Sequence, residues 1–411
     1  MFSVKLAEET ILNLVQPFDP IYDRESINLV DAVGRILSID LVSKLDFPHF
    51  TNSAMDGYAF HYADLEQFPA LEIASVDIPA GASSPIPLAI GQCARILTGG
   101  ILPDRADTVV MQEDITKIDR DHLKLEVVPA IGENVRPKGA FYRAGSLLLP
   151  AGTKIDPTSI GALAAAHYQQ IEVYRRPRVA ILSTGNELVD LYSQAELKLG
   201  QIIDSNQYSI ASLVRQTGAI AIPMGIVPDR KSELAQAIKD SIDTADIVIS
   251  SGGVSVGDYD YVETLLAEMG AEIHIRSVAI KPGKPLTVAT WQQDLPAPKL
   301  YFGVPGNPVS AMVSFWRFIA GSIAKLSGAN QSHWYPKFIT ATTTQDLHAQ
   351  GKRETYLWGY LRWQSGQYTF QPVDNYSSGN LISLVGTNAL AVLRVNQTYV
   401  PAGESVLILH L

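Results

Sequence analysis

Between Asp246 and Val262 the sequence gathers residue types that could bind a phosphate group. An apolar run typical of a buried strand leads into a loop of serine and glycine, and a helical pattern over 259–269 begins at two acidic residues. Glycines let the backbone turn tightly and bring its amide groups close to an anion, and these glycines are Gly252, Gly253 and Gly257. The start of the helix adds the positive end of its dipole. An ordinary tight turn with an acidic first helical turn has the same pattern, so the loop alone leaves both interpretations open.

The two acidic residues, Asp258 and Asp260, indicate what kind of ligand the loop suits. Carboxylates repel a bare anion, so they fit better when a divalent cation or a sugar hydroxyl lies between them and the phosphate. The sequence therefore suggests a phosphate ligand that is bound together with a metal ion or a sugar.

The elements that must position this loop form an alternating series that begins at Arg178. Strand and helix patterns follow one another, which is typical of an open, mostly parallel sheet covered by helices on both faces. Ligands of such sheets bind at the carboxyl ends of the strands. The predicted strands are 179–183, 219–227, 247–250, 273–280, 286–290 and 300–304, and the predicted helices are 207–217, 232–242, 259–269 and 308–325.

Four glycine-bearing loops of this series are expected to meet at one edge of the sheet. Lys281 and Lys284 in the third loop would supply positive charge for a phosphate, although two solvated lysines in a proline-stiffened turn are the alternative. In the fourth loop Asn307 is predicted to cap the next helix, with Pro308 at the first helical position. The loops are 184–187, 251–253, 281–285 and 304–308. Four such loops on one edge point to a ligand site more specifically than any one of them.

Length and composition limit the class of protein. The 411 residues are too many for one core, and a prior of roughly 150 residues per domain suggests about two to four domains. A net charge of −10 argues against nucleic acid or an anionic membrane as the main partner. The single cysteine, Cys93, excludes internal disulfides and cysteine-rich metal sites, which fits a reducing cytoplasm. Residues 1–13 lack a signal-peptide pattern, and the apolar segment 309–324, which contains Arg317, is expected to be a buried helix too short to span a bilayer.

The regions outside the alternating series have different patterns. Residues 4–16 predict an amphipathic helix. The aperiodic loop 47–60 carries Asp56 next to Gly57, and the residues alone favour a hairpin turn there. Short apolar runs separated by turn residues predict a small all-β module over 72–128 and a C-terminal β module over 336–411, and the Gly- and Pro-rich region 130–157 suggests a connection between domains.

Five motifs occur together and in the order typical of one family. They are Asn52–Ala59 (NSAMDGYA), Thr98–Pro103 (TGGILP), Ser250–Asp260 (SSGGVSVGDYD), Ala279–Pro285 (AIKPGKP) and Val304–Ser310 (VPGNPVS). Through them the chain resembles the molybdopterin molybdenumtransferases, the MoeA family, to which the E domain of gephyrin is also similar. The resemblance covers almost the full length. It implies an enzyme of molybdenum cofactor biosynthesis that inserts molybdate into the dithiolene of adenylylated molybdopterin, with Mg²⁺-dependent release of AMP.

The resemblance also implies which residues act. Asp56 and Thr98 from the small β domain and Glu187, Asp229 and Asp260 from the α/β domain would be catalytic, with Glu187 and Asp260 as the Mg²⁺ ligands. Carboxylates can hold Mg²⁺ against a phosphoanhydride, lysines can neutralise the leaving AMP, and a threonine can donate to an oxyanion. The implied substrate-binding residues are Ser251, Gly252, Gly253, Ser255, Lys281, Lys284, Pro305, Asn307 and Pro308.

The implied fold is multidomain, with a MoaB/MogA-like α/β domain between smaller domains. The implied limits are a linker domain at 1–47 and 141–176, a small β domain at 48–140, the α/β domain at 177–327 and a C-terminal β domain at 334–411. The implied partners are adenylylated molybdopterin, molybdate, a second copy of the chain in an elongated homodimer, and the molybdopterin adenylyltransferase, in the cytoplasm. In such dimers the active cleft lies between the α/β domain of one subunit and the small β domain of the other.

A non-catalytic pterin-binding or scaffold paralogue on the same fold is the alternative function. A catalytically silent paralogue is expected to lose Asp56 or the glycine-rich loop at 252–257, and both are present. The sequence therefore favours the enzyme over the scaffold.

Four places depart from the family pattern. Ala140 and Phe141 stand where the family has a pair of acids, Asn186 where aspartate is more common, and Ser277 and Trp358 where basic residues are expected. The absence of the acid pair at Ala140 and Phe141 predicts that this protein needs a higher Mg²⁺ concentration than a family member with the pair. The competing interpretation is that Phe141 packs in an apolar interface between domains. All four bear on the mechanism more than on the class of substrate.

Overall fold

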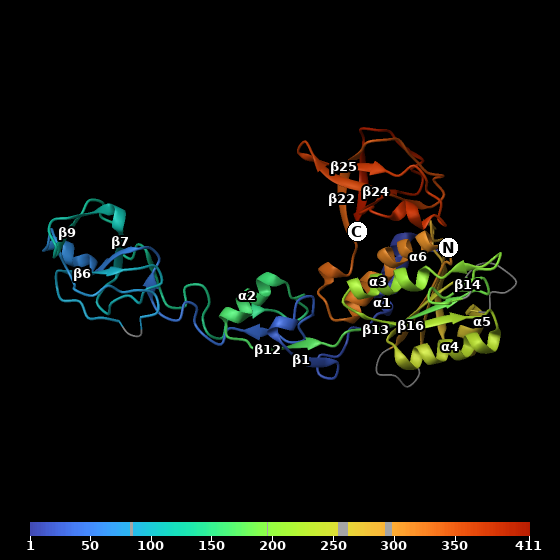
Figure 1. The fold of residues 1–411 in the computed structure, drawn as a ribbon, viewed down its shortest axis with the longest axis horizontal. Coiled ribbons are helices and arrows are strands. Elements are labelled where there is room, and N and C mark those ends of the chain that lie inside the picture. The colour runs from blue at the N-terminus through green and yellow to red at the C-terminus, as the bar shows by residue number, and fades with distance from the viewer. Residues whose placement is uncertain (83–84, 195, 254–261, 292–297) are drawn as a thin grey trace.

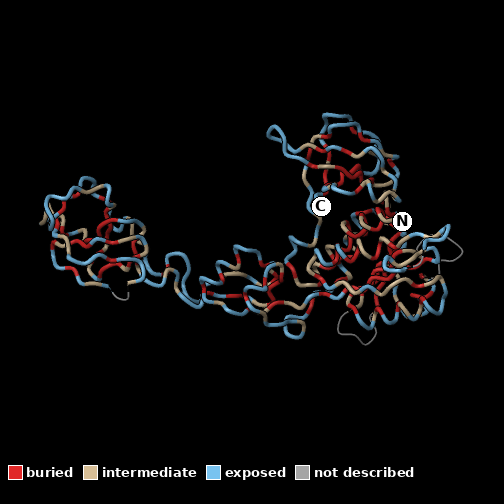
Figure 2. The backbone as a smooth tube through the Cα atoms, viewed as in Figure 1, coloured by how far each residue is buried: buried red, intermediate tan, exposed pale blue. Residues whose placement is uncertain are grey.

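The computed structural model describes residues 1–82, 85–194, 196–253, 262–291 and 298–411, and the molecule is elongated. A small β domain lies at one end, a linker domain lies in the middle, and an α/β domain and a C-terminal β domain lie at the other end (Figure 1). Both chain termini lie in this last part. Each part has its own buried residues, whereas the two segments that lead to the small β domain are largely exposed (Figure 2). The chain therefore folds around several cores, as its length predicts.

The α/β domain is built on a six-stranded sheet with the strand order β16-β13-β17-β21-β20-β18. The first four strands and β18 run in one direction and β20 runs in the other, so the sheet is open and mostly parallel. β13 has an unbroken apolar run over 179–182 because both of its faces are buried. The strands are β13 (Arg178–Thr184), β16 (Ile220–Val227), β17 (Ile247–Ser251), β18 (Glu272–Ser277), β20 (Pro285–Trp291) and β21 (Lys299–Val304).

Helices cover both faces of this sheet. Val179 and Ile181 of β13 lie in a core with α1, α3, α6 and α7, whereas Ala180 and Leu182 lie in a core with α4 and α5. Successive side chains of a strand point to opposite faces, so the two sets of helices lie on opposite sides. The helices are α1 (Val4–Leu14), α3 (Asn206–Gln216), α4 (Lys231–Thr244), α5 (Val262–Glu268), α6 (Pro308–Ser314) and α7 (Ala320–Leu326). The predicted start of the helix over 259–269 lies outside the described residues.

Residues 308–326 form one helical segment in which α6 and α7 are joined by a π-helical turn, Phe315–Ile319. By length and composition alone this segment could cross a membrane, so the expectation that it is too short was wrong. However, 67% of its most apolar window is buried inside the protein. Phe315, Phe318 and Ile319 pack in the core against the sheet, as a buried helix of a folded domain does.

The linker domain combines two antiparallel strand pairs with a short helix. Leu37, Ile155 and Leu163 belong to its core, which gives this connection packing of its own. The pairs are β1 (Arg24–Asn28) with β12 (Gln170–Tyr174) and β2 (Leu41–Val42) with β11 (Leu147–Leu149), and the helix is α2 (Pro157–Ala165).

The small β domain contains a six-stranded sheet with the order β7-β4-β6-β5-β9-β8 and a separate pair, β3 with β10. The hairpin interpretation of Asp56-Gly57 was wrong, because β3 pairs with β10 while β4 pairs with β6 and β7. Gly57 is required by packing instead, since a Cβ atom there would lie 1.9 Å from the carbonyl oxygen of Val110. The strands are β3 (Asn52–Ser53), β4 (Gly57–Phe60), β5 (Leu71–Ile73), β6 (Gln92–Ile96), β7 (Thr108–Met111), β8 (Ile115–Lys117), β9 (His122–Leu125) and β10 (Val135–Arg136).

The C-terminal β domain has the strand order β19-β24-β25-β22-β28-β26, and β24 also pairs with β26, so five of its strands close on themselves. The sixth strand, β19 (Ile280–Lys281), comes from the lysine-bearing loop and pairs in parallel with β24. The single strand predicted over 273–280 is therefore two strands that belong to different sheets. The other strands are β22 (Lys337–Thr343), β24 (Glu354–Gln364), β25 (Gln367–Pro372), β26 (Ala389–Leu393) and β28 (Ser405–His410).

Candidate functional site

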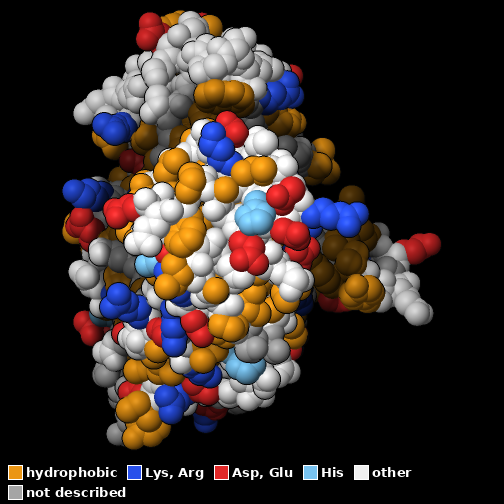
Figure 3. Space-filling model, turned by 90° about the vertical axis from the view of Figure 1, so that its left-hand side faces the viewer, with side chains coloured by type: hydrophobic (Ala, Val, Ile, Leu, Met, Phe, Trp, Pro, Cys, Tyr) orange, Lys and Arg blue, Asp and Glu red, His pale blue; other side chains and the backbone are white. Residues whose placement is uncertain are grey.

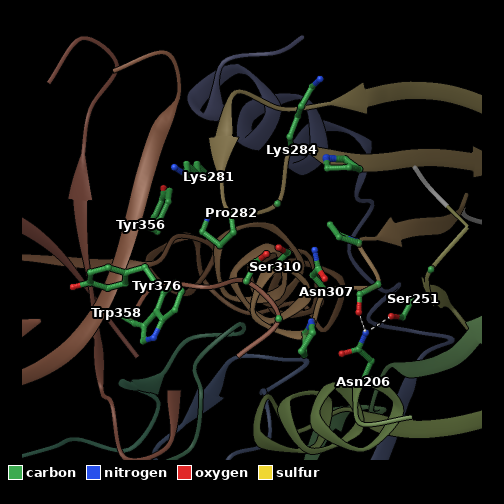
Figure 4. A pocket seen from close by; sticks show the side chains of 18 of the residues that line it. Asn206, Ser251, Lys281, Pro282, Lys284, Asn307, Ser310, Tyr356, Trp358 and Tyr376 are labelled. Carbon is green, nitrogen blue, oxygen red and sulfur yellow. Dashed lines mark hydrogen bonds between the residues drawn. The ribbon is translucent and has the colours of Figure 1, made fainter. Parts of the chain in front are cut away.

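A pocket of about 820 Å³ lies where the parallel strands end, and the C-terminal β domain forms one of its walls. All four predicted glycine-bearing loops contribute to it, so they meet at one edge as the strand-end rule predicts. In Figure 4, Lys281 and Lys284 lie on one side of the pocket, Asn206 and Ser251 on another, and Tyr376 on the wall of the C-terminal domain. The loop residues that line the pocket are Thr184, Glu187, Ser251, Gly252, Gly253, Lys281, Pro282, Gly283, Lys284, Pro285, Pro305, Gly306, Asn307 and Pro308.

Asp229 shapes the first loop rather than lining the pocket. Its Oδ1 accepts a hydrogen bond from the hydroxyl of Thr184 at 2.6 Å, and its Oδ2 accepts one from the backbone of Asn186 at 3.4 Å. The amide oxygen of Asn186 in turn accepts from the backbone N–H of Asp229 at 3.3 Å. Among the described side chains of the pocket wall Asp229 does not appear, so this predicted catalytic residue is placed to hold the loop.

Asn206 joins the second loop to the fourth. It is buried at the start of α3, and its Nδ2 donates to Ser251 Oγ at 2.6 Å and to the carbonyl oxygen of Gly306 at 2.8 Å (Figure 4). Position 252 beside it requires glycine, because its φ is +92° and a Cβ atom would lie 2.3 Å from the carbonyl oxygen of Thr184. Asn206 was not predicted from the sequence, because its partner Gly306 is 100 residues away in the chain.

The third loop carries the positive charge. Lys281 is half-buried on β19 and Lys284 is exposed. Arg353, on the loop before β24, also lines the pocket, and its Nη1 donates to the carbonyl oxygen of Ile280 at 3.1 Å. Within the described part of the chain none of these three cations has a carboxylate at ion-pair distance. As far as the described residues go, their charge is therefore available to an anionic ligand.

In the fourth loop, the side chain of Asn307 is not used to cap the helix. Asn307 occupies the cap position of α6 and Pro308 the first helical position, as predicted, but the Asn307 side chain makes no capping hydrogen bond. The expectation that Asn307 caps the helix with its side chain was therefore wrong. Its amide group lies at the pocket wall instead.

The wall from the C-terminal domain is aromatic. Trp358 and Tyr376 pack edge to face with their ring centres 5.0 Å apart, and Trp358 Nε1 donates to Ser383 Oγ at 2.9 Å. Burial raises the pKa of the Tyr376 hydroxyl, so this group stays neutral. Tyr356 lies on the same wall. The strand pattern of this domain was predicted, but nothing in that pattern shows where the domain packs.

Glu187 is the one acidic residue among the described residues that line the pocket. Its carboxylate lies over Gly185, where a Cβ atom would be 2.5 Å from Oε2. No three His, Cys, Asp or Glu side chains in the described ranges are close enough together to hold a metal ion. Asp260, its predicted partner for Mg²⁺, and Ser255 lie outside the described residues. One carboxylate fits Mg²⁺ only together with substrate phosphates and water, which is a usual arrangement for this ion.

Asp56 and Thr98 lie together at the far end of the molecule. Asp56 Oδ1 accepts hydrogen bonds from the backbone N–H and the hydroxyl of Thr98, both at 2.7 Å. These two bonds hold the pKa of the Asp56 carboxyl below its ordinary value. Because the small β domain lies at the opposite end from the pocket, one chain does not bring this pair to the other predicted residues (Figure 1).

The surface of the small β domain is not uniformly polar. Seen from that end of the molecule, hydrophobic side chains lie among charges of both signs (Figure 3). Met55, the residue before Asp56, is 41% exposed, and Val128 and Ile131 of the same domain are also exposed.

Phe141 and Ala140 lie in the segment that returns from the small β domain. Phe141 is 58% exposed, and its ring packs on that of Phe47 with the centres 5.8 Å apart. The side chain does not fill an interface between domains within one chain, which contradicts the packing interpretation for the isolated subunit.

Three family models match most of the chain. The model of the MoeA N-terminal region, which comprises domains I and II, matches residues 2–166. A model described as a probable molybdopterin binding domain matches residues 180–325, and the model of the MoeA C-terminal region, domain IV, matches residues 340–411.

Individual relatives agree with these models. The chain is 50% identical over 417 residues to a molybdopterin molybdenumtransferase from a Nostoc species, with 100% of this chain and 94% of the relative covered. It is 33% identical to a molybdopterin molybdenumtransferase from Haemophilus influenzae, with 93% of each chain covered. It is 30% identical to gephyrin from Dictyostelium discoideum over 98% of this chain and 62% of gephyrin. The structure of a molybdopterin biosynthesis MoeA protein from Pyrococcus horikoshii matches with a TM-score of 0.84 and 26% identity over 100% of both chains.

Proposed function

The chain belongs to the MoeA family of molybdopterin molybdenumtransferases and is a transferase of molybdenum cofactor biosynthesis, and we propose that it inserts molybdate into adenylylated molybdopterin with Mg²⁺-dependent release of AMP. One observation carries this proposal. The described wall of the pocket has three unpaired cations, Lys281, Lys284 and Arg353, and one carboxylate, Glu187. Molybdate, the phosphoanhydride and AMP are all anions, so this excess of positive charge suits each of them.

The residues of the pocket would bind the substrate and neutralise its charge rather than act as nucleophiles. In the proposed reaction the two dithiolene sulfurs replace two oxygens of molybdate, which leave as water. One such water attacks phosphorus, so that a P–O bond of the phosphoanhydride breaks and AMP leaves. Lys281 and Lys284 would stabilise the charge that gathers on the departing phosphate. The backbone amide of Gly253 can approach the phosphate oxygens closely because no side chain blocks it, whereas the N–H of Gly252 donates to the carbonyl oxygen of Val304 at 3.2 Å. No side-chain nucleophile is needed.

Magnesium fits this site as an ion shared between protein and substrate. Glu187 would hold it from the first loop, and Asp260 is the second ligand that we propose. When bound, Mg²⁺ would neutralise charge on the phosphoanhydride oxygens. Asp229 would act by holding the loop of Glu187, since its own oxygens are bonded to Thr184 and Asn186.

A second copy of the chain would complete the site. Asp56 and Thr98 lie far from the pocket of their own chain, and Asp56 is exposed beside the exposed Met55. We infer that the small β domain of one subunit faces the pocket of the other in a homodimer. The molybdopterin adenylyltransferase would supply the substrate, in the cytoplasm.

Mixing two inactive variants tests the shared site. Asp56→Asn and the double variant Lys281→Ala with Lys284→Ala are dissociated together and allowed to reassociate. Each mixed dimer would have one intact site of two, so random pairing restores roughly a quarter of the wild-type rate. A mixture that stays inactive although mixed dimers are detected contradicts a site made by two subunits.

The reaction itself is tested with purified components. The protein is incubated with adenylylated molybdopterin, molybdate and Mg²⁺, and AMP and active cofactor are measured. We expect both products, and we expect neither when Mg²⁺ is chelated. AMP release without cofactor formation would show a hydrolase, and binding without either product would favour a scaffold.

A further inference from the structure

Four side chains from three separate parts of the chain form a largely buried polar cluster next to the pocket: Glu8, Arg317, Glu354 and Tyr356, here called the Arg317 cluster. Arg317 Nε donates to the Tyr356 hydroxyl at 3.0 Å, and its two terminal nitrogens donate to the carboxylate of Glu8 on α1. The Tyr356 hydroxyl donates to Glu354 Oε1 at 2.5 Å. Arg317 is 7% exposed and Tyr356 is fully buried, so water competes little for these bonds.

The cluster ends at the strand that positions Lys281. Glu354 lies on β24 and pairs with Ile280, and its backbone N–H donates to the carbonyl oxygen of Ala279 at 2.9 Å. Lys281 pairs with Thr355 of the same strand. A shift of β24 would therefore move the lysine that faces the pocket.

The start of the chain is tied to the same segment. The backbone N–H of Phe2 donates to the carbonyl oxygen of Ser277 at 3.0 Å, and the N–H of Ala279 donates to the carbonyl oxygen of Phe2 at 2.8 Å. α1, which carries Glu8, begins directly after this contact. Both ends of the cluster thus lead to the residues that precede Lys281.

We propose that the Arg317 cluster is a positioning device that fixes β19 against β24 and so holds Lys281 at the pocket. The proposal rests on the proposed function, because it takes Lys281 to bind an anionic part of the substrate. Arg317 does not line the pocket, so it acts through Tyr356 and β24. The position of Arg317 in the π-helical turn supports this, since such turns often occur near functional sites.

The central experiment compares Arg317→Met with two other variants. Arg317→Lys keeps the charge and loses the two-pronged contact, and Arg276→Met removes an exposed ion pair with Glu263 in the same domain. The dissociation constant of AMP is measured by calorimetry well below the melting temperature. We expect Arg317→Met to raise it roughly five- to tenfold, Arg317→Lys to recover part of the loss and Arg276→Met to leave it unchanged.

A double-mutant cycle separates positioning from general stability. If Arg317 acts through Lys281, the variant with both Arg317→Met and Lys281→Ala binds AMP no more weakly than Lys281→Ala alone. Additive losses, or a lower melting temperature with unchanged AMP binding, overturn the proposal. If Arg317→Met does not fold, Tyr356→Phe removes only the shared hydroxyl and takes its place in the cycle.

Hydrogen exchange gives a test that does not depend on the ligand. Arg317→Met should speed exchange at the backbone amides of Ala279 and Glu354 more than at those of β13. Unchanged exchange at these two amides overturns the positioning role. A wild-type protein that does not bind AMP contradicts the proposed function instead, and the exchange data still decide on the cluster.

Discussion

Lys281 and Asp56 are held in opposite ways at the two ends of the molecule. Lys281 lies on a strand shared by two domains, next to the buried Arg317 cluster, in a pocket lined by several loops. Asp56 is exposed, and the described hydrogen bonds to its carboxylate come from a single neighbour, Thr98. The difference shows that the pocket is built within one chain, whereas the Asp56 carboxylate is oriented locally and, in the proposed homodimer, would face the pocket of the other subunit.

The largest expected effect is at the locally held end. Asp56→Asn keeps the size of the side chain and removes its charge, and we expect turnover to fall by a factor of about 100 or more. The melting temperature should stay unchanged because the residue is exposed on a loop. Steady-state kinetics and a melting curve measure both.

Asp77→Asn is the matched control for this substitution. Asp77 is exposed in the same domain and pairs with Arg95 at 3.1 Å. We expect wild-type turnover from this variant. If Asp56→Asn turns over as fast as Asp77→Asn and the wild type, Asp56 is not part of the proposed site. The site would then consist of the pocket alone.

At the pocket end we expect smaller effects, because several groups share the charge. Lys281→Ala should weaken AMP binding about tenfold, and Lys284→Ala should weaken it less because Lys284 is exposed. Both losses should shrink as ionic strength rises, since salt already screens part of the attraction. Calorimetry at two salt concentrations measures this. If both variants bind AMP with unchanged affinity, Lys281 and Lys284 do not contact the ligand and are ordinary solvated lysines.

The same comparison explains what the sequence could predict. The alternation of strands and helices predicts that the loops at the carboxyl ends of the strands meet at one edge of the sheet. The four loops were therefore placed together correctly. Periodicity shows which face of a strand is buried but not which sheet the strand joins, so the separate strand β19 was missed. Asn206 and Trp358 were missed as pocket residues because their contacts depend on how distant segments pack.

A third prediction concerns the segment that joins the two ends. Phe141 is 58% exposed and packs on Phe47, so the double change Ala140→Glu with Phe141→Asp buries no unpaired charge within one chain. We expect a change in unfolding free energy within about 0.5 kcal/mol. We also expect a Mg²⁺ midpoint for activity lower by roughly two- to fivefold, since added carboxylates can hold or orient the ion.

A Mg²⁺ titration and melting curves of both proteins test this prediction. The variant Ala140→Gln with Phe141→Asn is the control, because it changes the same side chains without adding charge. An unchanged midpoint together with a large loss of stability would favour a packing role for Phe141 in the dimer.

The smallest expected effect concerns the Asp56–Thr98 pair itself. Both hydrogen bonds from Thr98 lower the pKa of Asp56, and Thr98→Val removes the hydroxyl bond while the backbone bond remains. The pKa of Asp56 should therefore rise part of the way toward its ordinary value. If the ionised carboxylate is the active form, activity is present above this pKa and is lost as the pH falls through it. The acid limb of the pH–rate profile should then move to higher pH in Thr98→Val and stay in place in Thr98→Ser. Because kcat/KM reports the free protein, its profile is the one to measure. A limb that does not move would mean that another group controls it and that the Thr98 hydroxyl acts on the substrate rather than on Asp56.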